Sequence, residues 1–269
     1  MDSPPFKDNV VVITGASSGI GSEVACQLAD QGACLALLAR DAERLEAVAA
    51  ECTRRGGRPA VVPADVSVQA ECQRALARAV ERYGRIDTLI NNAGVGMWAR
   101  FEEVQDPSFF AYLMSVNYLG SVYSTFYALP WLKQARGRIV AVSSVAGRIG
   151  VPLRSGYAAT KHAMVGFFDS LRMELAPYGV SVTVAYPDFV ATDARARNFG
   201  PDGRPLGRSP AREDLMMTAE TCARFIVRGA ARRQRDVLMT GRGRFGPWLK
   251  LVAPGLVDRF ACRAIARGR

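Results

Sequence analysis

The sequence has little histidine and no closely paired cysteines, and both shortages limit the chemistry expected of it. One histidine, His162, stands among 269 residues, and none of the six cysteines belongs to a C-x-x-C pair. These features argue against a disulfide framework and a zinc site, so we expect no metal centre. Unpaired thiols favour a reducing compartment, and the expected location is the cytoplasm.

An apolar leader, an internal repeat and a low-complexity linker are also missing. The chain begins with Met1-Asp-Ser-Pro-Pro-Phe-Lys-Asp, which contains no apolar run, so we expect no secretory signal. Hydrophobic residues make up 49% of the chain and charged residues 22%, which excludes disorder as the main state. The length predicts one or two globular domains.

Charge is scarce outside the C-terminal end. The formal net charge is +10, and residues 228–269 supply nine of these charges, because eleven Arg and Lys there face two Asp. The rest of the chain is nearly neutral, so no nucleic-acid partner is expected. Pro107–Leu132 carries no charge over 26 residues, long enough to span a bilayer, but Ser, Thr and Asn are scattered through it. We expect a buried or subunit-interface helix there.

Short apolar runs alternate with segments of helical length. The expected strands are Val10–Ile13, Cys34–Ala39, Ala60–Val62, Thr88–Ile90, Arg138–Val142, Val180–Ala185 and Val237–Thr240. The expected helices are Ile20–Gln31, Ala42–Arg55, Val68–Tyr83, Pro107–Lys133 and Tyr157–Tyr178. This alternation predicts an α/β fold with a doubly wound parallel sheet, a Rossmann fold. We expect one domain over 1–240, with an insertion at 193–213, and a basic tail over 241–269.

A glycine-rich loop follows the first expected strand, with the sequence Thr14-Gly15-Ala16-Ser17-Ser18-Gly19-Ile20-Gly21. Its glycines permit a tight turn, and N–H groups at the start of the next helix can approach a pyrophosphate. The G-x-x-x-G-x-G spacing differs from the G-x-G-x-x-G of the general dinucleotide fingerprint. A plain glycine-rich turn is the alternative.

The same loop contains Gly15-Ala16-Ser17-Ser18-Gly19, which matches the G-x-S-x-G nucleophile elbow of serine hydrolases. A hydrolase would need His162 as its base, yet His162 lies in an expected helix beside Tyr157 and Lys161, whose spacing has a better explanation. An elbow on the first strand is also unusual. A serine hydrolase therefore stays an alternative function.

The end of the second strand, Leu37-Leu38-Ala39-Arg40-Asp41, indicates which nicotinamide cofactor fits. NAD sites place an acidic residue here on the ribose 2′-hydroxyl, whereas NADP sites accommodate the 2′-phosphate with a basic one. Ala39 stands at the acidic position, Arg40 follows it, and Ser17 can add a hydroxyl donor. We predict NADP(H) rather than NAD(H), with a solvated strand-end Arg40 as the alternative.

Tyr157 and Lys161 stand four residues apart at the start of an expected helix and so share one face. The pKa of tyrosine is about 10, too high for efficient proton exchange at neutral pH, and a neighbouring ammonium lowers it. Ser144 follows the strand at 138–142, at the carboxyl end where doubly wound sheets bind ligands. A helix-start or turn serine is the alternative.

These motifs together resemble the short, single-domain branch of the short-chain dehydrogenase/reductase (SDR) family. The resemblance covers about residues 8–240 and rests on Thr14–Gly21, Asp65-Val66, Asn91-Asn92-Ala93-Gly94, Asn117, Ser144, Tyr157-x-x-x-Lys161 and Pro187 with Thr192. It implies an NADP(H)-dependent oxidoreductase that transfers a hydride between nicotinamide and a carbonyl or secondary alcohol.

The resemblance also implies residue roles. Tyr157 would be the general acid/base, Lys161 would hold the nicotinamide ribose and lower the tyrosine pKa, and Ser144 would bond the substrate oxygen. Asn117 would support a water that feeds protons to Lys161. Asp65 and Val66 would contact the adenine, Asn92 and Gly94 the ribose side, and Val190 and Thr192 the carboxamide. The implied cofactor-binding residues are Gly15, Ser17, Ser18, Gly19, Ile20, Gly21, Arg40, Asp65, Val66, Asn92, Ala93, Gly94, Tyr157, Lys161, Pro187, Val190 and Thr192.

One position departs from the family pattern, because Pro187 is followed by Asp188 where the family usually has glycine. An aspartate there could crowd the nicotinamide or add a negative charge near its ring. An inactive cofactor-binding scaffold is kept separately as a third function, against which the full set of catalytic residues argues.

The substrate is expected to be small and apolar. Candidate pocket residues in loops and in the insertion are Met97, Trp98, Phe189, Phe199, Met216 and Met217, with ordinary packing as the alternative. Five arginines of the insertion are expected to be solvated rather than to clamp an acidic substrate: Arg195, Arg197, Arg204, Arg208 and Arg212.

Two expectations concern partners. The resemblance implies a homodimer or homotetramer, formed through 107–133 and 157–178. The tail is predicted to form two short helical pieces broken at Pro254, with Arg259, Arg263 and Arg267 on one face and apolar residues displaced from it. It either contacts an anionic membrane, at its inner face, or packs on the body of the protein.

Overall fold

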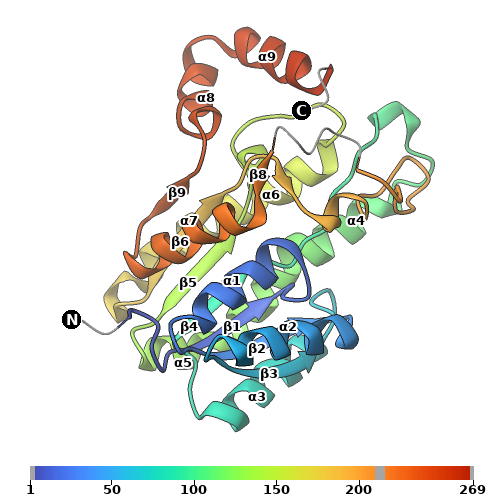
Figure 1. Ribbon diagram of the computed structural model, residues 1–269. Coiled ribbons are helices and arrows are strands. Elements are labelled where there is room, and N and C mark those ends of the chain that lie inside the picture. Colours follow the sequence, from blue (N-terminus) through green and yellow to red (C-terminus); the bar gives the residue numbers. More distant parts are fainter. Residues whose placement is uncertain (1–3, 210–215, 267–269) are drawn as a thin grey trace.

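Seven parallel strands form one sheet through the molecule in the computed structural model, which describes residues 4–209 and 216–266 (Figure 1). The strands are β1 (Val10–Thr14), β2 (Cys34–Ala39), β3 (Arg58–Pro63), β4 (Thr88–Asn91), β5 (Arg138–Val142), β6 (Ser181–Tyr186) and β9 (Asp236–Leu238). Their order is β3-β2-β1-β4-β5-β6-β9, so the winding direction reverses between β1 and β4. This order confirms the doubly wound fold and puts a ligand-binding crevice at that reversal.

Helices cover both faces of the sheet. One layer holds α1 (Gly19–Ala29), α2 (Ala42–Arg54) and α7 (Ala219–Ala231), and the other holds α3 (Gln69–Tyr83), α5 (Gly120–Gln134) and α6 (Ser155–Leu175). Side chains of successive strand residues enter opposite layers: Ile13 packs in the first and Val12 in the second. This double burial explains why the strands are continuous apolar runs. The sequence prediction omitted α7, although its Cys222, Ala223, Ile226 and Ala230 form a buried stripe.

The uncharged segment is a broken helix that packs one face on the protein. It comprises α4 (Ser108–Met114), a π-helical turn η2 (Ser115–Leu119) and α5. Polar side chains of the inner face are buried and bonded: the Asn91 amide donates to Thr125 Oγ1 at 3.0 Å, and Ser121 Oγ donates to the Asn117 carbonyl at 2.9 Å. Ser108 and Phe126 are exposed, so the helix is buried on one face only. Within residues 4–209 and 216–266, no helix is both long enough and apolar enough to cross a membrane.

Short elements complete the carboxyl side of the sheet. They are the 3₁₀ turns η1 (Phe101–Glu103), η3 (Val145–Gly147) and η5 (Asp193–Arg195), and the two-stranded pair of β7 (Val190–Ala191) with β8 (Met217–Thr218). A further 3₁₀ turn, η4 (Ala176–Tyr178), joins α6 to the start of β6. The pair brackets the insertion, of which residues 210–215 lie outside the described chain. Phe199 ties the insertion to the core by a bridge to Met97.

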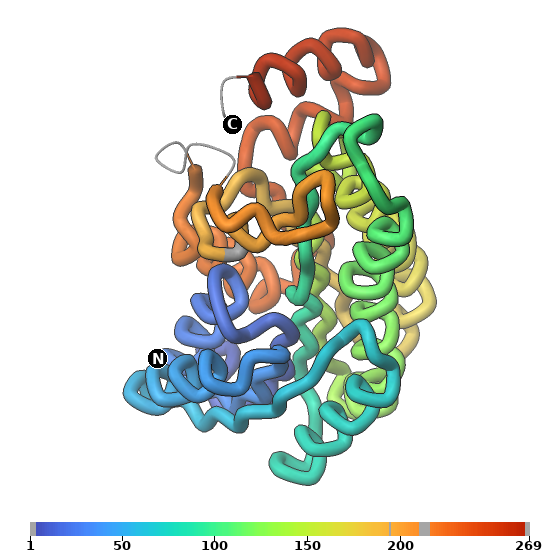
Figure 2. The backbone as a smooth tube through the Cα atoms, turned by 90° about the vertical axis from the view of Figure 1, so that its right-hand side faces the viewer, coloured from blue at the N-terminus to red at the C-terminus, as the bar shows by residue number. Residues whose placement is uncertain are grey.

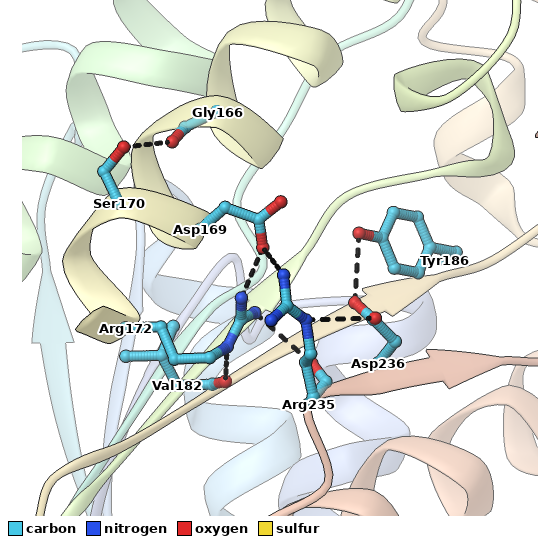
Figure 3. A network of polar contacts seen from close by, with 8 residues as sticks. All are labelled: Gly166, Asp169, Ser170, Arg172, Val182, Tyr186, Arg235 and Asp236. Atoms are coloured by element: carbon cyan, nitrogen blue, oxygen red, sulfur yellow. Dashed lines mark hydrogen bonds and ion pairs between the residues drawn. The ribbon is translucent and has the colours of Figure 1, made fainter. Parts of the chain in front are cut away.

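A polar network fixes the edge strand β9 to α6 (Figure 3). Asp169 on α6 accepts hydrogen bonds from Arg172 and from Arg235, which precedes β9, and Arg172 Nε donates to the Val182 carbonyl of β6 at 2.9 Å. On β9 itself, Asp236 accepts a hydrogen bond from the Tyr186 hydroxyl at 3.2 Å. Because the tail continues directly from β9, this network also sets where the tail leaves the body.

The tail forms α8 (Gly241–Val252) and α9 (Pro254–Ala266), which lie beyond the rest of the chain in both views (Figures 1 and 2). The predicted break at Pro254 is confirmed. Strand β9 is shorter than predicted because Thr240 caps α8, accepting the Gly243 N–H at 3.2 Å. On the inner side, Leu249 and Val257 pack with three residues that follow β5: Val145, Ile149 and Val151. Arg267 lies outside the described residues.

Candidate active site

At two positions of the glycine loop, Gly15 and Gly21, the neighbouring backbone is too close to leave room for a side chain. Gly15 has φ +67°, and a Cβ on it would lie 2.8 Å from the Ala93 Cα. A Cβ on Gly21 would lie 2.2 Å from the Gly15 carbonyl oxygen. Helix α1 begins directly after the loop, without an acidic residue in its first turn and without a side-chain cap from Ser18. Its first N–H groups are therefore available to an anion.

The loop after β4 is joined to the glycine loop by Thr14, the first residue of the glycine-rich motif, for which the sequence predicted no role. Its hydroxyl accepts the backbone N–H groups of Asn92 at 3.0 Å and Ala93 at 3.1 Å. In return, the Asn92 amide donates to the carbonyls of Thr14 at 3.0 Å and Gly15 at 3.1 Å. These bonds hold the two loops as one rigid rim on either side of the point where the strand order reverses.

A cavity of about 490 Å³ lies along this rim. Every residue predicted to bind the cofactor lines it except Gly21, which stands behind Gly15 where it permits the turn. The cavity thus combines an uncapped helix start with glycines that a Cβ would block, which fits a dinucleotide. Individual contacts with the cofactor remain predictions.

Basic side chains gather at the β2 end of this cavity. Arg40, Arg44 and Arg197 all line it, and Arg197 donates to Ser18 Oγ at 2.7 Å. Arg40 donates to the Tyr112 hydroxyl at 3.2 Å and lies 3.9 Å from an Asp65 carboxylate oxygen. Desolvation, followed by repulsion from Arg44, lowers the pKa of Arg197. The sequence motifs do not include Arg44. Arg197 was expected to be solvated, and it is exposed, but it also lines the cavity.

The predicted catalytic side chains come together at the other end of the cavity. Ser144, Tyr157 and Lys161 line it, and Lys161 Nζ lies 5.7 Å from the centroid of the Tyr157 ring. Ser144 Oγ donates to the Pro187 carbonyl at 3.3 Å and accepts the Ala146 N–H at 3.2 Å. Lys161 Nζ donates to the Val142 carbonyl at 2.9 Å. Burial lowers the pKa of Lys161 to about 8.

Asn117 lies behind these residues and lines neither this cavity nor the next one. It sits in the π-helical turn, where its amide oxygen accepts the Val95 N–H at 2.8 Å. Its amide nitrogen donates to the Val95 carbonyl and to Thr160 Oγ1, both at 2.9 Å. Asn117 therefore braces the loop at Gly94–Val95 against helix α6, which carries Tyr157 and Lys161.

A second cavity, of about 480 Å³, meets the first at Ser144, Arg154 and Asp188. One wall is the apolar segment after β5, with Val145 and Ile149, and the other is α8 and α9. Of the predicted pocket residues, Phe189 lines this cavity and Phe199 lines the first one. Met97 and Met217 instead pack in hydrophobic clusters, while Trp98 faces Arg154; neither cavity includes these three or Met216.

Asp188, the departure from the family pattern, turns toward the tail. Its carboxylate lies 3.1 Å from Arg242 Nε and accepts a hydrogen bond from Thr240 Oγ1 at 3.3 Å. Arg242 is the second residue of α8, so Asp188 connects the loop after β6 to the start of the tail. The guanidinium of Arg242 therefore offsets the negative charge that Asp188 places near the expected nicotinamide site.

The insertion arginines do not behave alike. Arg204 and Arg208 are exposed as expected, but the expectation was wrong for Arg195, which is 6% exposed and lies 5.2 Å from the Phe189 ring centroid. Arg195 is buried because the insertion folds back over the first cavity, which it lines. Arg212 lies outside the described residues.

The hydrolase alternative finds no support in the geometry. His162 Nδ1 lies 2.8 Å from the Ala158 carbonyl, one turn earlier on α6, and the ring lines neither cavity. Ser17 lines the nucleotide cavity instead, without a histidine beside it. In the described part of the chain, no three His, Cys, Asp or Glu side chains are grouped to hold a metal ion.

The comparison with protein families decides the class. A sequence model described as short chain dehydrogenase matches residues 9–201. The chain belongs to the short chain dehydrogenase family. It is therefore a nucleotide-binding oxidoreductase acting on hydroxyl groups, which confirms the resemblance drawn from its motifs.

The similarity to known dehydrogenases extends beyond residues 9–201. An 11-beta-hydroxysteroid dehydrogenase of Pinus massoniana is 38% identical over 266 residues, covering 94% of this chain and 73% of the relative. The 11-beta-hydroxysteroid dehydrogenase-like 4A of Arabidopsis thaliana is 38% identical over 257 residues, covering 95% and 84%. Among solved structures, an alcohol dehydrogenase of the archaeon Thermococcus sibiricus complexed with 5-hydroxy-NADP has a TM-score of 0.72 and 29% identity, over 81% of this chain and 88% of that one.

Proposed function

We propose that this dehydrogenase is an NADP(H)-dependent oxidoreductase that interconverts a carbonyl and a secondary alcohol on a small, apolar substrate. One observation carries the proposal: Ser144 lies where the nucleotide cavity meets the largely apolar cavity, and Tyr157 and Lys161 line the nucleotide cavity beside it. A reacting carbon at that junction would have a cofactor on one side and an apolar environment on the other.

Each catalytic residue has a task at that junction. A bound nicotinamide supplies or accepts the hydride. Tyr157 donates its proton to the oxygen during reduction and removes it during oxidation, while the Ser144 hydroxyl stabilises the oxygen's developing charge by a hydrogen bond. Lys161, with a pKa of about 8, favours the phenolate and can exchange protons near neutral pH. Asn117 links the loop at Gly94–Val95 to α6 by hydrogen bonds. We propose that it also holds a water that supplies protons to Lys161.

Substitution of Tyr157 by phenylalanine tests this function directly. We expect at least about a hundredfold loss in NADPH consumption with a panel of ketones and aldehydes, because the proton donor is gone while the ring still packs. Tyr127→Phe is the matched control, since its hydroxyl accepts a hydrogen bond from Gln69 outside both cavities. Wild-type turnover by a folded Tyr157→Phe protein would refute Tyr157 as the proton donor, and no turnover by the wild type would favour the inactive scaffold.

The preference for NADP(H) follows from the arginines at the end of β2. Arg40, Arg44 and Arg197 border the cavity where a ribose 2′-phosphate would lie, and the pKa of Arg197 is lowered partly by its cationic neighbours. A dianionic phosphate relieves this repulsion, whereas a bare hydroxyl does not. The Thermococcus sibiricus dehydrogenase, which is complexed with an NADP derivative, agrees with this preference.

The apolar substrate is inferred from the second cavity. Its lining is mainly aliphatic and aromatic, and a volume of about 480 Å³ suits a small organic molecule. The Pinus and Arabidopsis relatives are named for hydroxysteroids, which are apolar alcohols, and this agrees with the lining.

We also propose that the protein forms a homodimer or homotetramer through α4–α5 and α6. Large apolar side chains on these helices point outward: Phe126 is 66% exposed and Met173 71%. A second copy would cover them. Light scattering at micromolar concentration should give a dimer or tetramer, and a monomer would contradict this assignment.

The outer side of the tail suits an anionic lipid surface. Four large apolar side chains of the tail are exposed and line neither cavity: Trp248, Leu251, Val252 and Leu256. Basic residues interleave with them, among which Arg244, Lys250 and Arg259 are exposed. Apolar groups can enter the acyl boundary while the cations face acidic headgroups. The inner side packs on the body, so both uses expected of the tail are compatible.

Liposome co-sedimentation tests the membrane contact. The protein should bind vesicles rich in phosphatidylserine, and the binding should weaken with salt and with a Trp248→Ser, Leu251→Ser double substitution. Phe225→Ser, on α7 and 39% exposed, is the control for general loss of exposed apolar surface. If the protein does not bind anionic vesicles at low ionic strength, the tail is structural.

A cytoplasmic location stays a proposal that rests on the cysteines, all six of which are free thiols.

A further inference from the structure

Arg154 is a cation placed where the two cavities join. It precedes helix α6 and stands three residues before Tyr157, and its side chain lines both the nucleotide cavity and the apolar cavity. None of the sequence motifs includes it. Its location alone puts a guanidinium beside any substrate whose oxygen reaches Ser144 and Tyr157.

Aromatic rings, rather than acids, surround this guanidinium. Its central carbon lies 5.1 Å from the ring centroid of Tyr157, 5.3 Å from that of Trp98 and 5.5 Å from that of Phe189. Aromatic faces stabilise a cation but take up few of its five N–H donors. The rings therefore hold the guanidinium in place and leave its hydrogen-bonding edge unused.

No acid of the described chain neutralises Arg154. It forms no ion pair within residues 4–209 and 216–266, and its buried Nε has no hydrogen-bond partner there. The nearby acid is Asp188, which is committed to Arg242 at 3.1 Å and to Thr240. Burial lowers the pKa of Arg154, and the charges of Tyr157 and Asp188 offset this effect only in part.

The Arg154 side chain is half-buried and its buried Nε lacks a partner, so an anionic ligand at the junction would satisfy a donor that the rings leave free. A planar carboxylate matches the fork of an arginine with two parallel hydrogen bonds. Two further arginines line the apolar cavity: Arg242, which is paired with Asp188, and the exposed Arg263. Of the three, Arg154 alone also lines the nucleotide cavity, so one positive charge stands at the junction and matches one carboxylate.

We propose that Arg154 binds a carboxylate of the substrate, so that the protein acts on apolar oxo acids and their hydroxy-acid counterparts. The carboxylate lies against Arg154, the oxygen that reacts lies between Ser144 and Tyr157, and the aliphatic remainder extends between Ile149 and the tail helices. This assignment rests on the proposed function and specifies its substrate class.

Two matched comparisons test the assignment. Turnover of 2-oxodecanoate and 4-oxodecanoate with NADPH is compared with turnover of their methyl esters, which lack the negative charge and carry one more methyl group. Binding of decanoate, which has no carbonyl to reduce, is measured by calorimetry on the NADP⁺-saturated protein. Arg154→Gln removes the charge, and Arg204→Gln, an exposed arginine of the insertion, is the control.

The wild type should prefer at least one oxo acid over its ester by about tenfold or more. Arg154→Gln should lower kcat/KM for that acid by about tenfold to a hundredfold, mainly through KM, and leave the ester within about threefold. It should weaken decanoate binding by a similar factor. Arg204→Gln should change none of these values.

Other outcomes would overturn the assignment. If acid and ester are reduced equally well, or if Arg154→Gln lowers kcat for both alike and shifts the pH profile, Arg154 acts on Tyr157 and not on a carboxylate. If no carbonyl compound is reduced, the proposed function fails separately, and decanoate binding that depends on Arg154 would still support the carboxylate site. If no carbonyl compound is reduced and decanoate does not bind through Arg154, both the proposed function and the carboxylate site are refuted.

Discussion

The two cavities that meet at Ser144 differ in what forms their walls. The nucleotide cavity is lined by loops at the carboxyl edge of the sheet, which are cross-linked through Thr14 and Asn92. The apolar cavity has one wall on the body and another on α8–α9, which is joined to the body by Asp188 and by a small apolar cluster. The difference indicates that cofactor and substrate recognition can change independently, because they depend on separate segments.

Removal of residues 241–269 should have the largest effect of all, and it should impair substrate turnover far more than NADPH binding. The truncated protein loses one wall of the apolar cavity, so kcat/KM for an apolar ketone should fall by about a hundredfold, because apolar area that the substrate buried becomes solvent. NADPH affinity should change by less than about threefold, since none of the described tail residues, 241–266, lines the nucleotide cavity. Equal loss of both properties would contradict the separation and the proposed domain limit at residue 240.

A charge reversal at Arg40 should affect the nucleotide cavity alone. The wild type should bind NADPH more tightly than NADH, and Arg40→Asp should reverse the order and weaken NADPH binding by about thirtyfold, because a charged hydrogen bond to the 2′-phosphate becomes a repulsion. Arg54→Asp makes the same charge change at the other end of α2 and should leave both affinities unaltered. Tighter NADH binding by the wild type would refute the assignment.

Lys161 gives the nucleotide cavity a pH-dependent stability. Its pKa falls from 10.5 in the unfolded chain to about 8 in the folded protein, so the unfolded state binds more protons between these values and stability rises with pH. The wild type should gain about 1.4 kcal/mol between pH 7 and pH 9 relative to Lys161→Met, measured by urea unfolding without cofactor. Lys250→Met, in the exposed tail, should leave the pH dependence intact. A parallel pH dependence in Lys161→Met would show that the lysine is not desolvated.

Loss of the ion pair between the loop after β6 and the tail should have the smallest effect. Arg242→Ala removes the partner of Asp188 but leaves Thr240 and the apolar cluster, so KM for an apolar ketone should rise by about threefold at unchanged kcat. Arg244→Ala, two residues further along α8, is the control. A drop in NADPH affinity in Arg242→Ala would show that Asp188 disturbs the nicotinamide loop when it is unpaired.

The fold and the nucleotide cavity could be predicted because their determinants are local. Gly15, Gly19 and Gly21 are required by backbone geometry, and the strands are recognisable as continuous apolar runs because both faces of the sheet are covered. Tyr157 and Lys161 stand one helical turn apart, so their proximity follows from sequence spacing.

The substrate cavity could not be predicted in the same way, because its walls come from segments about a hundred residues apart. Val145 and Ile149 contact Leu249 and Val257 through the tertiary fold, and no short-range pattern indicates this contact. Arg154 likewise belongs to no periodic pattern. Apolar loop residues such as Met97 were plausible pocket candidates, yet they pack inward where the insertion bridges to them. The contact of Asp188 with Arg242 spans 54 positions and likewise has no local signal.

Transfer of deuterium to the product tests the central claim most directly. The protein is incubated with NADPH that carries two deuterium atoms at C4 and with a panel of apolar ketones, aldehydes and oxo acids, and products are analysed by mass spectrometry. The account predicts an alcohol with one deuterium on its carbinol carbon, formed by the wild type and by Tyr127→Phe and reduced at least about a hundredfold in Tyr157→Phe. An alcohol without deuterium, or equal deuterium transfer by Tyr157→Phe, would contradict it.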